Sequence, residues 1–169
     1  MAYTSANFPT YAGSTAIAGK KFILYVANIP EGGSSTAKWE MVGGLRDTGI
    51  QVSADAIDAS NKGSNGWGES ITGTRSWTAS PSLVVKTGNK GDELIEAWVF
   101  DEDIQNERPA LRFAFVNTQT KEYYDSWGTV SSYSIDASYS DVMTKSIEIN
   151  GVCALVKRAE FSVDTVVSD

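Results

Sequence analysis

The chain has 169 residues and a net charge of −7, with 41% hydrophobic and 11% aromatic residues, which suits one domain with a substantial core. It has no histidine and a single cysteine, Cys153, which excludes the usual general base, a cysteine-rich zinc site and an intrachain disulfide. The acidic balance excludes a general nucleic-acid binder, because such affinity comes largely from basic side chains that neutralise phosphates.

Residues 1–19 carry no charged side chain and show no sustained period. Two interpretations stay open for this segment. It is either a frayed terminus or an arm that packs on a neighbouring subunit through Tyr3, Phe8 and Tyr11. The predicted organisation is an N-terminal arm (1–19), a β-barrel domain (20–156) and a C-terminal strand or extension (157–169).

The N-terminus has neither the basic start nor the continuous apolar segment of a secretory signal. The longest apolar run, Phe22 to Ala27, is too short to span a bilayer. We therefore expect a soluble protein made in a reducing cytoplasm, without a membrane partner.

Strands dominate the first half of the chain. Lys20 to Asn28 is apolar on both faces, which predicts a strand that is covered on two sides. Further strands are predicted over Trp39–Leu45, Thr48–Ala54 and Ser70–Ala79. The intervening segment, Asp55 to Gly68, has little regular pattern, and loops of this length inside a compact domain are often functional.

One helix is predicted over about 91–101, with Asn89 or Asp92 as its cap. An apolar stripe at helical spacing indicates the face that packs on the sheet; it consists of Leu94, Ile95, Trp98 and Val99. Acidic residues recur from Asp92 to Glu107 without a basic one. A solvated helix face followed by a loop accounts for them, and the rim of a channel is the alternative.

Strict alternation marks the second half. Apolar residues alternate over 111–116 and again over 132–139 and 146–150, with polar turns at 117–121 and 140–141. This pattern is typical of half-buried antiparallel hairpins, with 122–127 as the partner of the first strand. The sequence predicts an all-β fold: an antiparallel β-sandwich or barrel with one packed α-helix.

The sequence holds no recognisable catalytic motif. Carboxylate pairs such as Asp55 with Asp58, or Glu96 with Asp101, are the remaining way to build a hydrolase, but acids at such positions are ordinarily surface charges. Residues 101–103 lack the glycine and terminal glutamate of a dedicated calcium loop. We expect no enzyme and no cofactor. Cys153 lies in an apolar stretch, which predicts a small buried side chain.

Two ordered stretches carry a further pattern. The first, 42–77, has a Gly-containing strand, an Ile57-Asp58 segment with Lys62 nearby, the pair Gly66-Trp67 and a final strand ending at Trp77. The second, 128–151, is a hairpin with an aspartate turn that ends in glycine. With a helix between them, these stretches resemble the major tail tube protein family of long, non-contractile-tailed bacteriophages.

The resemblance implies a structural virion protein whose hexameric rings stack into the tail tube, a conduit through which double-stranded DNA passes without sequence-specific binding. It also implies tape measure and tail-end proteins as partners, and assembly in the host cytoplasm. The exposed strand edges of each subunit would form hydrogen bonds with those of the neighbouring subunits in the ring. The Ala54–Trp67 segment would form the contact between rings; its candidate residues are Asp55, Ile57, Asp58, Lys62 and Trp67.

Two alternatives remain at this point. Trp67 is either an interface anchor or a local cover over the end of the barrel. The whole chain is alternatively a carbohydrate-binding β-sandwich that uses Trp39, Trp67 and Trp77, with tyrosines, as a sugar platform. The lack of a signal peptide and of disulfides argues against an extracellular lectin.

Overall fold

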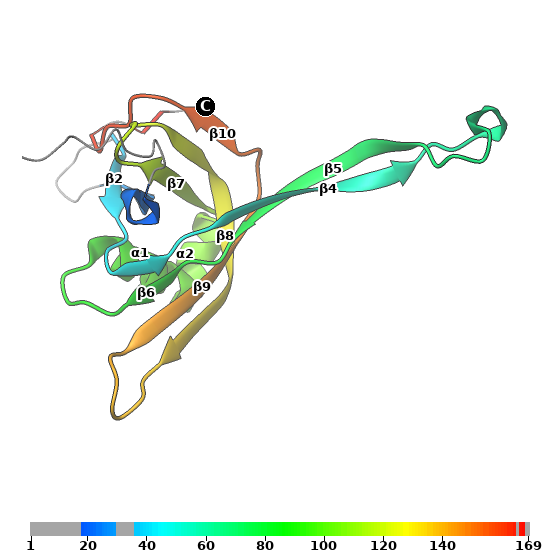
Figure 1. Cartoon of the computed structure of the whole chain (residues 1–169). Helices are drawn as coiled ribbons and strands as arrows, with labels where there is room; N and C mark the ends of the chain where they lie inside the picture. Colours follow the sequence, from blue (N-terminus) through cyan, green and yellow to red (C-terminus); the bar gives the residue numbers. More distant parts are fainter. Residues whose placement is uncertain (1–17, 30–35, 165, 168–169) are drawn as a thin grey trace, which may run out of the picture.

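Ten β-strands of the described residues form one antiparallel sheet that curls into a barrel, and two helices pack on it (Figure 1). The computed structural model describes residues 18–29, 36–164 and 166–167. The strands are β1 (Phe22–Asn28), β2 (Lys38–Met41), β3 (Leu45–Asp47), β4 (Ile50–Asp58), β5 (Ser70–Ala79), β6 (Ser82–Val84), β7 (Leu111–Asn117), β8 (Tyr123–Asp136), β9 (Thr144–Gly151) and β10 (Val156–Arg158). The helices are α1 (Lys90–Phe100) and α2 (Glu102–Glu107). The predicted all-β fold class is confirmed.

The barrel closes because two consecutive strands, β2 and β3, pair at opposite ends of the sheet. β1 pairs with β2 and β7, β7 with β8, β8 with β9, and β9 with β6, which pairs with β3. A turn at Gly43 and Gly44 separates β2 from β3. Gly44 has φ of 76°, and a Cβ there would collide with the carbonyl oxygen of Val84. The prediction of a single strand over Trp39–Leu45 is therefore wrong. The glycine turn divides this stretch into β2, which pairs with β1, and β3, which pairs with β6.

β1 lies between two apolar layers, as predicted. Leu24 and Val26 belong to the main core inside the barrel, with the buried rings of Phe113 and Phe115. On the other side of the sheet a second cluster is built on Trp39, Ala114, Val116 and Tyr123. The ring of Phe161, after β10, lies 4.7 Å from Tyr25 and 5.2 Å from Tyr123, so the C-terminal segment covers this outer layer.

Helix α1 forms where the sequence predicts it, and its apolar stripe packs inward. Asn89 caps the helix by accepting a hydrogen bond from the backbone N–H of Asp92. Ile95 is fully buried in the main core, and Trp98 is 6% exposed. A second helix, α2, replaces the predicted loop, because the Asp101 side chain accepts hydrogen bonds from the next turn and starts a new helix.

The two hairpins of the second half share a strand. β8 pairs with β7 over its first half and with β9 over its second half, so the two predicted strands 122–127 and 132–139 are one long strand. Ile147 and Ile149 of β9 are buried, as predicted. Tyr139, at the end of the alternating stretch over 132–139, is fully exposed, because β8 ends at Asp136 and the barrel does not reach the hairpin tip.

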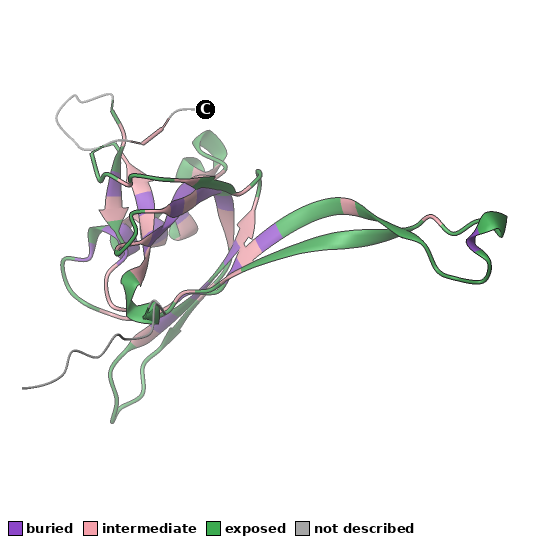
Figure 2. Cartoon of the chain, turned by 45° about the horizontal axis from the view of Figure 1, so that its top comes forward, coloured by how far each residue is buried: buried purple, intermediate pink, exposed green. Residues whose placement is uncertain are grey.

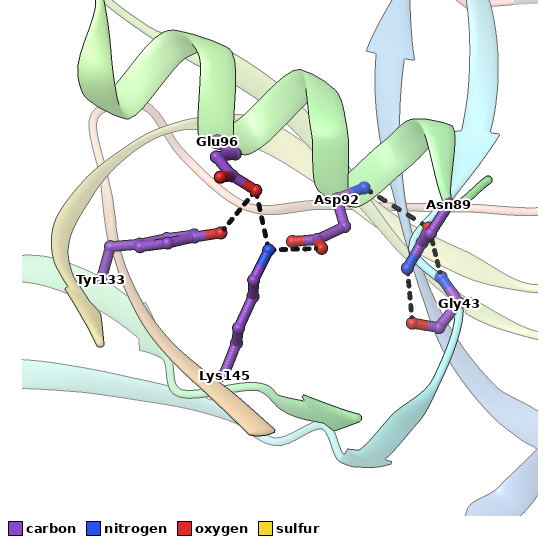
Figure 3. A network of polar contacts seen from close by, with 6 residues as sticks. All are labelled: Gly43, Asn89, Asp92, Glu96, Tyr133 and Lys145. Atoms are coloured by element: carbon purple, nitrogen blue, oxygen red, sulfur yellow. Dashed lines mark hydrogen bonds and ion pairs between the residues drawn. The ribbon is translucent and has the colours of Figure 1, made fainter. Parts of the chain in front are cut away.

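An ion-pair network around the buried side chain of Lys145 joins α1 to the β8–β9 hairpin (Figure 3). The ammonium group of Lys145 lies 2.8 Å from Asp92 and 2.8 Å from Glu96, and Glu96 also accepts a hydrogen bond from the hydroxyl of Tyr133. Burial alone would lower the pKa of Lys145, but the hydrogen bonds to both acids outweigh it and raise the pKa. The hydrogen bond from Lys145 lowers the pKa of Glu96. Asp92 is therefore a buried part of the fold, whereas the Glu96 side chain stays 43% exposed at the edge of the network.

Replacing Lys145 with methionine should destabilise the protein by about 3–5 kcal/mol, because the buried carboxylate of Asp92 would lose its countercharge. Chemical denaturation of dilute protein, followed by tryptophan fluorescence, measures this loss. Lys38→Met is the matched control: Lys38 and Asp164 form an exposed pair, which contributes about 1 kcal/mol or less. Equal losses in the two variants would contradict a structural role for the network.

Candidate assembly interface

A long hairpin, β4 and β5, leaves the barrel and projects away from it (Figure 1). Only its root is paired to the rest of the sheet, where Thr78 and Ala79 of β5 pair with Asn150 and Ile149 of β9. Beyond the root both strands are exposed on both faces over most of their length (Figure 2). A two-stranded ribbon of this kind is marginally stable alone, so the root has to hold it.

Trp77 is the anchor at the root. Its side chain is 4% exposed, meets Phe115 edge to face, and donates a hydrogen bond from Nε1 to the carbonyl oxygen of Cys153 at 2.8 Å. The indole fits because it lies directly against the backbone of Gly151. A Cβ at Gly151 would overlap the indole ring, and a Cβ at Gly128 would lie 3.2 Å from it. Sequence reasoning identified the glycine that ends the hairpin but not its contact with Trp77.

The arm of the hairpin exposes aliphatic side chains. Val52 is 60% exposed, and Ile57 and Ile71, which lie directly opposite each other on the two strands, are 51% and 58% exposed. A break in register between Ala54 and Ala56 interrupts the ladder. Scattered exposed apolar residues are ordinary, but an uncovered ribbon with apolar side chains along it is a surface that other chains pair with or pack on.

The hairpin tip is a self-contained hydrogen-bonded loop. A short 3₁₀ helix, η3 (Lys62–Ser64), is capped by Asn61, whose side chain accepts a hydrogen bond from the Gly63 N–H, while the Asn61 backbone N–H donates to the Ser64 hydroxyl oxygen. Ser60 and Glu69 close the loop across its base through the Glu69 N–H and the Ser60 hydroxyl, at 2.9 Å. The tip therefore has a definite shape without help from the barrel.

Trp67 is the most exposed of the five tryptophans, at 81%. It stands on the tip and does not cover the barrel end, which removes that interpretation. Asp58 also lies on the tip, and hydrogen bonds from the hydroxyl and backbone N–H of Ser60 lower the pKa of its carboxyl group. The tip thus presents a large aromatic ring next to negative charge.

The structure places all five candidate contact residues on the outer half of this hairpin. Asp55, Ile57 and Asp58 lie on β4, Lys62 in η3 and Trp67 in the loop after it. The irregular segment predicted over 55–68 was therefore too long, because β4 continues to Asp58 by pairing with β5. The candidate arm residues Tyr3, Phe8 and Tyr11 lie outside the described residues, and their role stays a prediction.

The structure contradicts two other interpretations made from the sequence, the sugar platform and the burial of Cys153. The sugar platform fails, because Trp39 and Trp77 are each 4% exposed while Trp67 is remote on the hairpin tip. Cys153 is exposed, so the predicted burial is wrong; its carbonyl oxygen, however, accepts hydrogen bonds from the Trp77 indole and the Ser126 hydroxyl.

Within the described ranges, no cluster of three or more acidic or cysteine side chains is arranged to hold a metal ion. Asp101 uses its carboxylate to cap α2. No described helix has the length and apolar character needed to cross a membrane.

A barrel with a long, shaped and uncovered extension is typical of a structural protein that assembles with other chains. A family model for phage tail tube proteins matches residues 16–157, so the chain belongs to the phage tail tube protein family. It is therefore a structural component of a phage-type tail tube. No curated protein sequence is similar enough to count as a match.

Solved structures share the fold at low sequence identity. The tail of an empty gene transfer agent particle, refined with C6 symmetry, has a TM-score of 0.64 at 19% identity, over 85% of this chain and 100% of that one. The SPP1 tail tube has a TM-score of 0.63 at 13% identity, over 85% and 80%. The sheath–tube complex of an extracellular contractile injection system has a TM-score of 0.55 at 15% identity, over 94% and 99%.

Gly151→Ala should loosen the root of the hairpin, because the added methyl group displaces Trp77 and breaks its hydrogen bond to Cys153. We expect a loss of about 1–3 kcal/mol from overpacking, with a weaker near-ultraviolet circular dichroism signal from the indole. Gly68→Ala is the control on the same hairpin, since no atom lies within 4 Å of the Cβ it adds. An unchanged Gly151→Ala spectrum and stability would contradict the anchoring role.

Proposed function

We propose that this chain forms hexameric rings that stack into a tail tube, through which double-stranded DNA passes into the host. Membership of the tail tube family supports the structural role, and the C6 symmetry of the similar gene transfer agent tail supports the ring. Assembly would take place in the host cytoplasm, with a tape measure protein and tail-end proteins as partners, and the product would be part of the virion.

The observation that carries the ring is a pair of free strand edges on one sheet. The sheet runs β8-β9-β5-β4, and no described strand pairs with the outer edge of β4. At the opposite end, β7 leaves β8 at Gly128, so within the described chain the outer edge of β8 from Thr129 to Asp136 is also free. The β4 edge of one subunit pairing with the β8 edge of the next would consume both edges and close a ring.

The charge of the chain suits the interior of such a ring. A net charge of −7 offers passing phosphates little to bind, whereas a basic wall would hold the duplex and release it only at high salt. The free β8 edge carries hydroxyl side chains at Ser131, Ser132 and Ser134, which are exposed and uncharged. A wall of this composition would allow DNA to slide without reading its sequence.

Electron microscopy of negatively stained protein at high concentration tests the proposal. Rings with six-fold symmetry or hollow filaments are expected. The test variant replaces residues 54–75 with an Asn-Gly turn, which joins the cross-strand partners Ser53 and Ser76 by a two-residue hairpin. The barrel should stay folded, because Trp77 remains in place, but filaments should be absent.

Two outcomes would count against this function. A wild-type protein that stays monomeric at high concentration in analytical ultracentrifugation would refute the tube. Filaments formed by the shortened variant, with a normal thermal unfolding transition, would refute the role of the hairpin but not the tube.

A further inference from the structure

We propose that the Trp67 tip of one subunit docks into a pocket at the root of the same hairpin on a subunit of the adjacent ring. This inference rests on the proposed tube and names the two surfaces that would join its rings. The tip cannot fill the pocket of its own chain, because the extended hairpin separates them (Figure 1). A tip and a pocket at opposite ends of one hairpin form a contact that repeats from copy to copy.

The pocket lies where β5, β9 and β10 meet, and has a volume of about 490 Å³. All of its lining residues lie in the described chain, and most are apolar or uncharged; among them are Val52, Trp77, Tyr124, Val152 and Leu155. Val52 and Val152 are 60% and 58% exposed at its mouth. A concave apolar site of this size accommodates an aromatic side chain, and Trp67 is the exposed aromatic ring on the hairpin.

Charge complementarity favours this occupant. The charged residues that line the pocket are Arg75 and Lys157, both basic, in a protein that is acidic as a whole. The tip carries Asp58 and Glu69 beside Trp67, and only Lys62 offsets them. Lys157 lies 3.3 Å from Glu122, but both side chains are about half exposed, so this pair contributes little and leaves Lys157 available to a docked acid.

The shape of the tip also suits docking. Its internal hydrogen bonds hold the loop in one form before contact, so little conformational freedom is lost on binding. Tryptophan and arginine are enriched at interface hot spots, where they fill well-packed pockets. The inference therefore assigns Trp67 as the anchor and Arg75 and Lys157 as its rim.

The single exposed cysteine makes the contact testable in the full chain. Cys153 lines the pocket, so Gly68→Cys, which keeps Trp67, places a second thiol on the docking tip. Filaments of this variant are oxidised with copper phenanthroline and separated on a non-reducing denaturing gel. Because a disulfide needs Cα atoms within about 7 Å, a ladder of covalent multimers is expected only if the tip occupies the pocket.

The controls separate this contact from other cross-links. The wild-type chain and the double variant Gly68→Cys/Cys153→Ser each have one thiol and can give no more than dimers. Tyr139→Cys, on the tip of the β8–β9 hairpin, should also give no ladder. Filaments of Gly68→Cys that yield only monomers and dimers would overturn the docking while leaving the tube intact; absence of filaments from the wild-type protein would refute the tube itself.

A second pair of variants tests the pocket without a cross-link. Trp67→Ala and Val152→Asp should each raise the concentration needed for filament growth at least tenfold, because one removes the anchor and the other places a negative charge before the acidic tip. Val163→Asp, at a similarly exposed valine outside the pocket, should leave it within twofold. Equal effects at Val152 and Val163, or none at Trp67, would overturn the assignment.

Discussion

A two-stranded ribbon has no interior, and this constraint governs the rest of the molecule. The β4–β5 hairpin exposes both faces and cannot bury enough apolar surface to hold itself in place. It persists as an extension because its root is fixed: Trp77 is enclosed by the barrel, hydrogen-bonded to the Cys153 carbonyl and packed on Gly151. The barrel thus works as a base for an element that needs a partner along its length.

Hydrogen bonds stabilise the glycine turn at which the barrel closes. The glycine turn that closes it is tied to the start of α1, because the side chain of Asn89 bonds both the N–H and the carbonyl of Gly43. Three residues after Asn89, Asp92 pairs with Lys145, which joins the same helix to β9 (Figure 3). One helix therefore fixes the closing turn and the β8–β9 hairpin together, and the root of the β4–β5 hairpin is paired to the same β9 strand.

A constant relation between two free edges and one projecting tip is what a repeating assembly requires. Small errors in angle would accumulate from copy to copy in a ring or a filament, so the contacts must be carried by rigid elements. Membership of the phage tail tube protein family is consistent with this geometry. In the proposed tube, the acidic chain would offer passing DNA few positive charges.

Local pattern by itself determined much of this protein. Strict alternation defined β5, β7 and β9, the apolar stripe defined α1, and the absence of histidine removed most catalytic chemistry, because these properties depend on neighbours a few residues apart. The ordered motifs around Trp67 and Gly151 also pointed to the family. Candidate residues Asp55 to Trp67 were found because an irregular stretch between strands is visible in the sequence.

Only the tertiary structure decided which residues meet across long separations in the chain. The burial of Lys145 depends on Asp92 and Glu96, some fifty residues away, and a lysine in an alternating strand gives no sign of such partners. Nothing local shows that β4 continues to Asp58, since its pairing comes from β5. The exposure of Cys153 and the burial of Trp39 and Trp77 follow in the same way from where the barrel ends, which is a property of the packed sheet rather than of any segment.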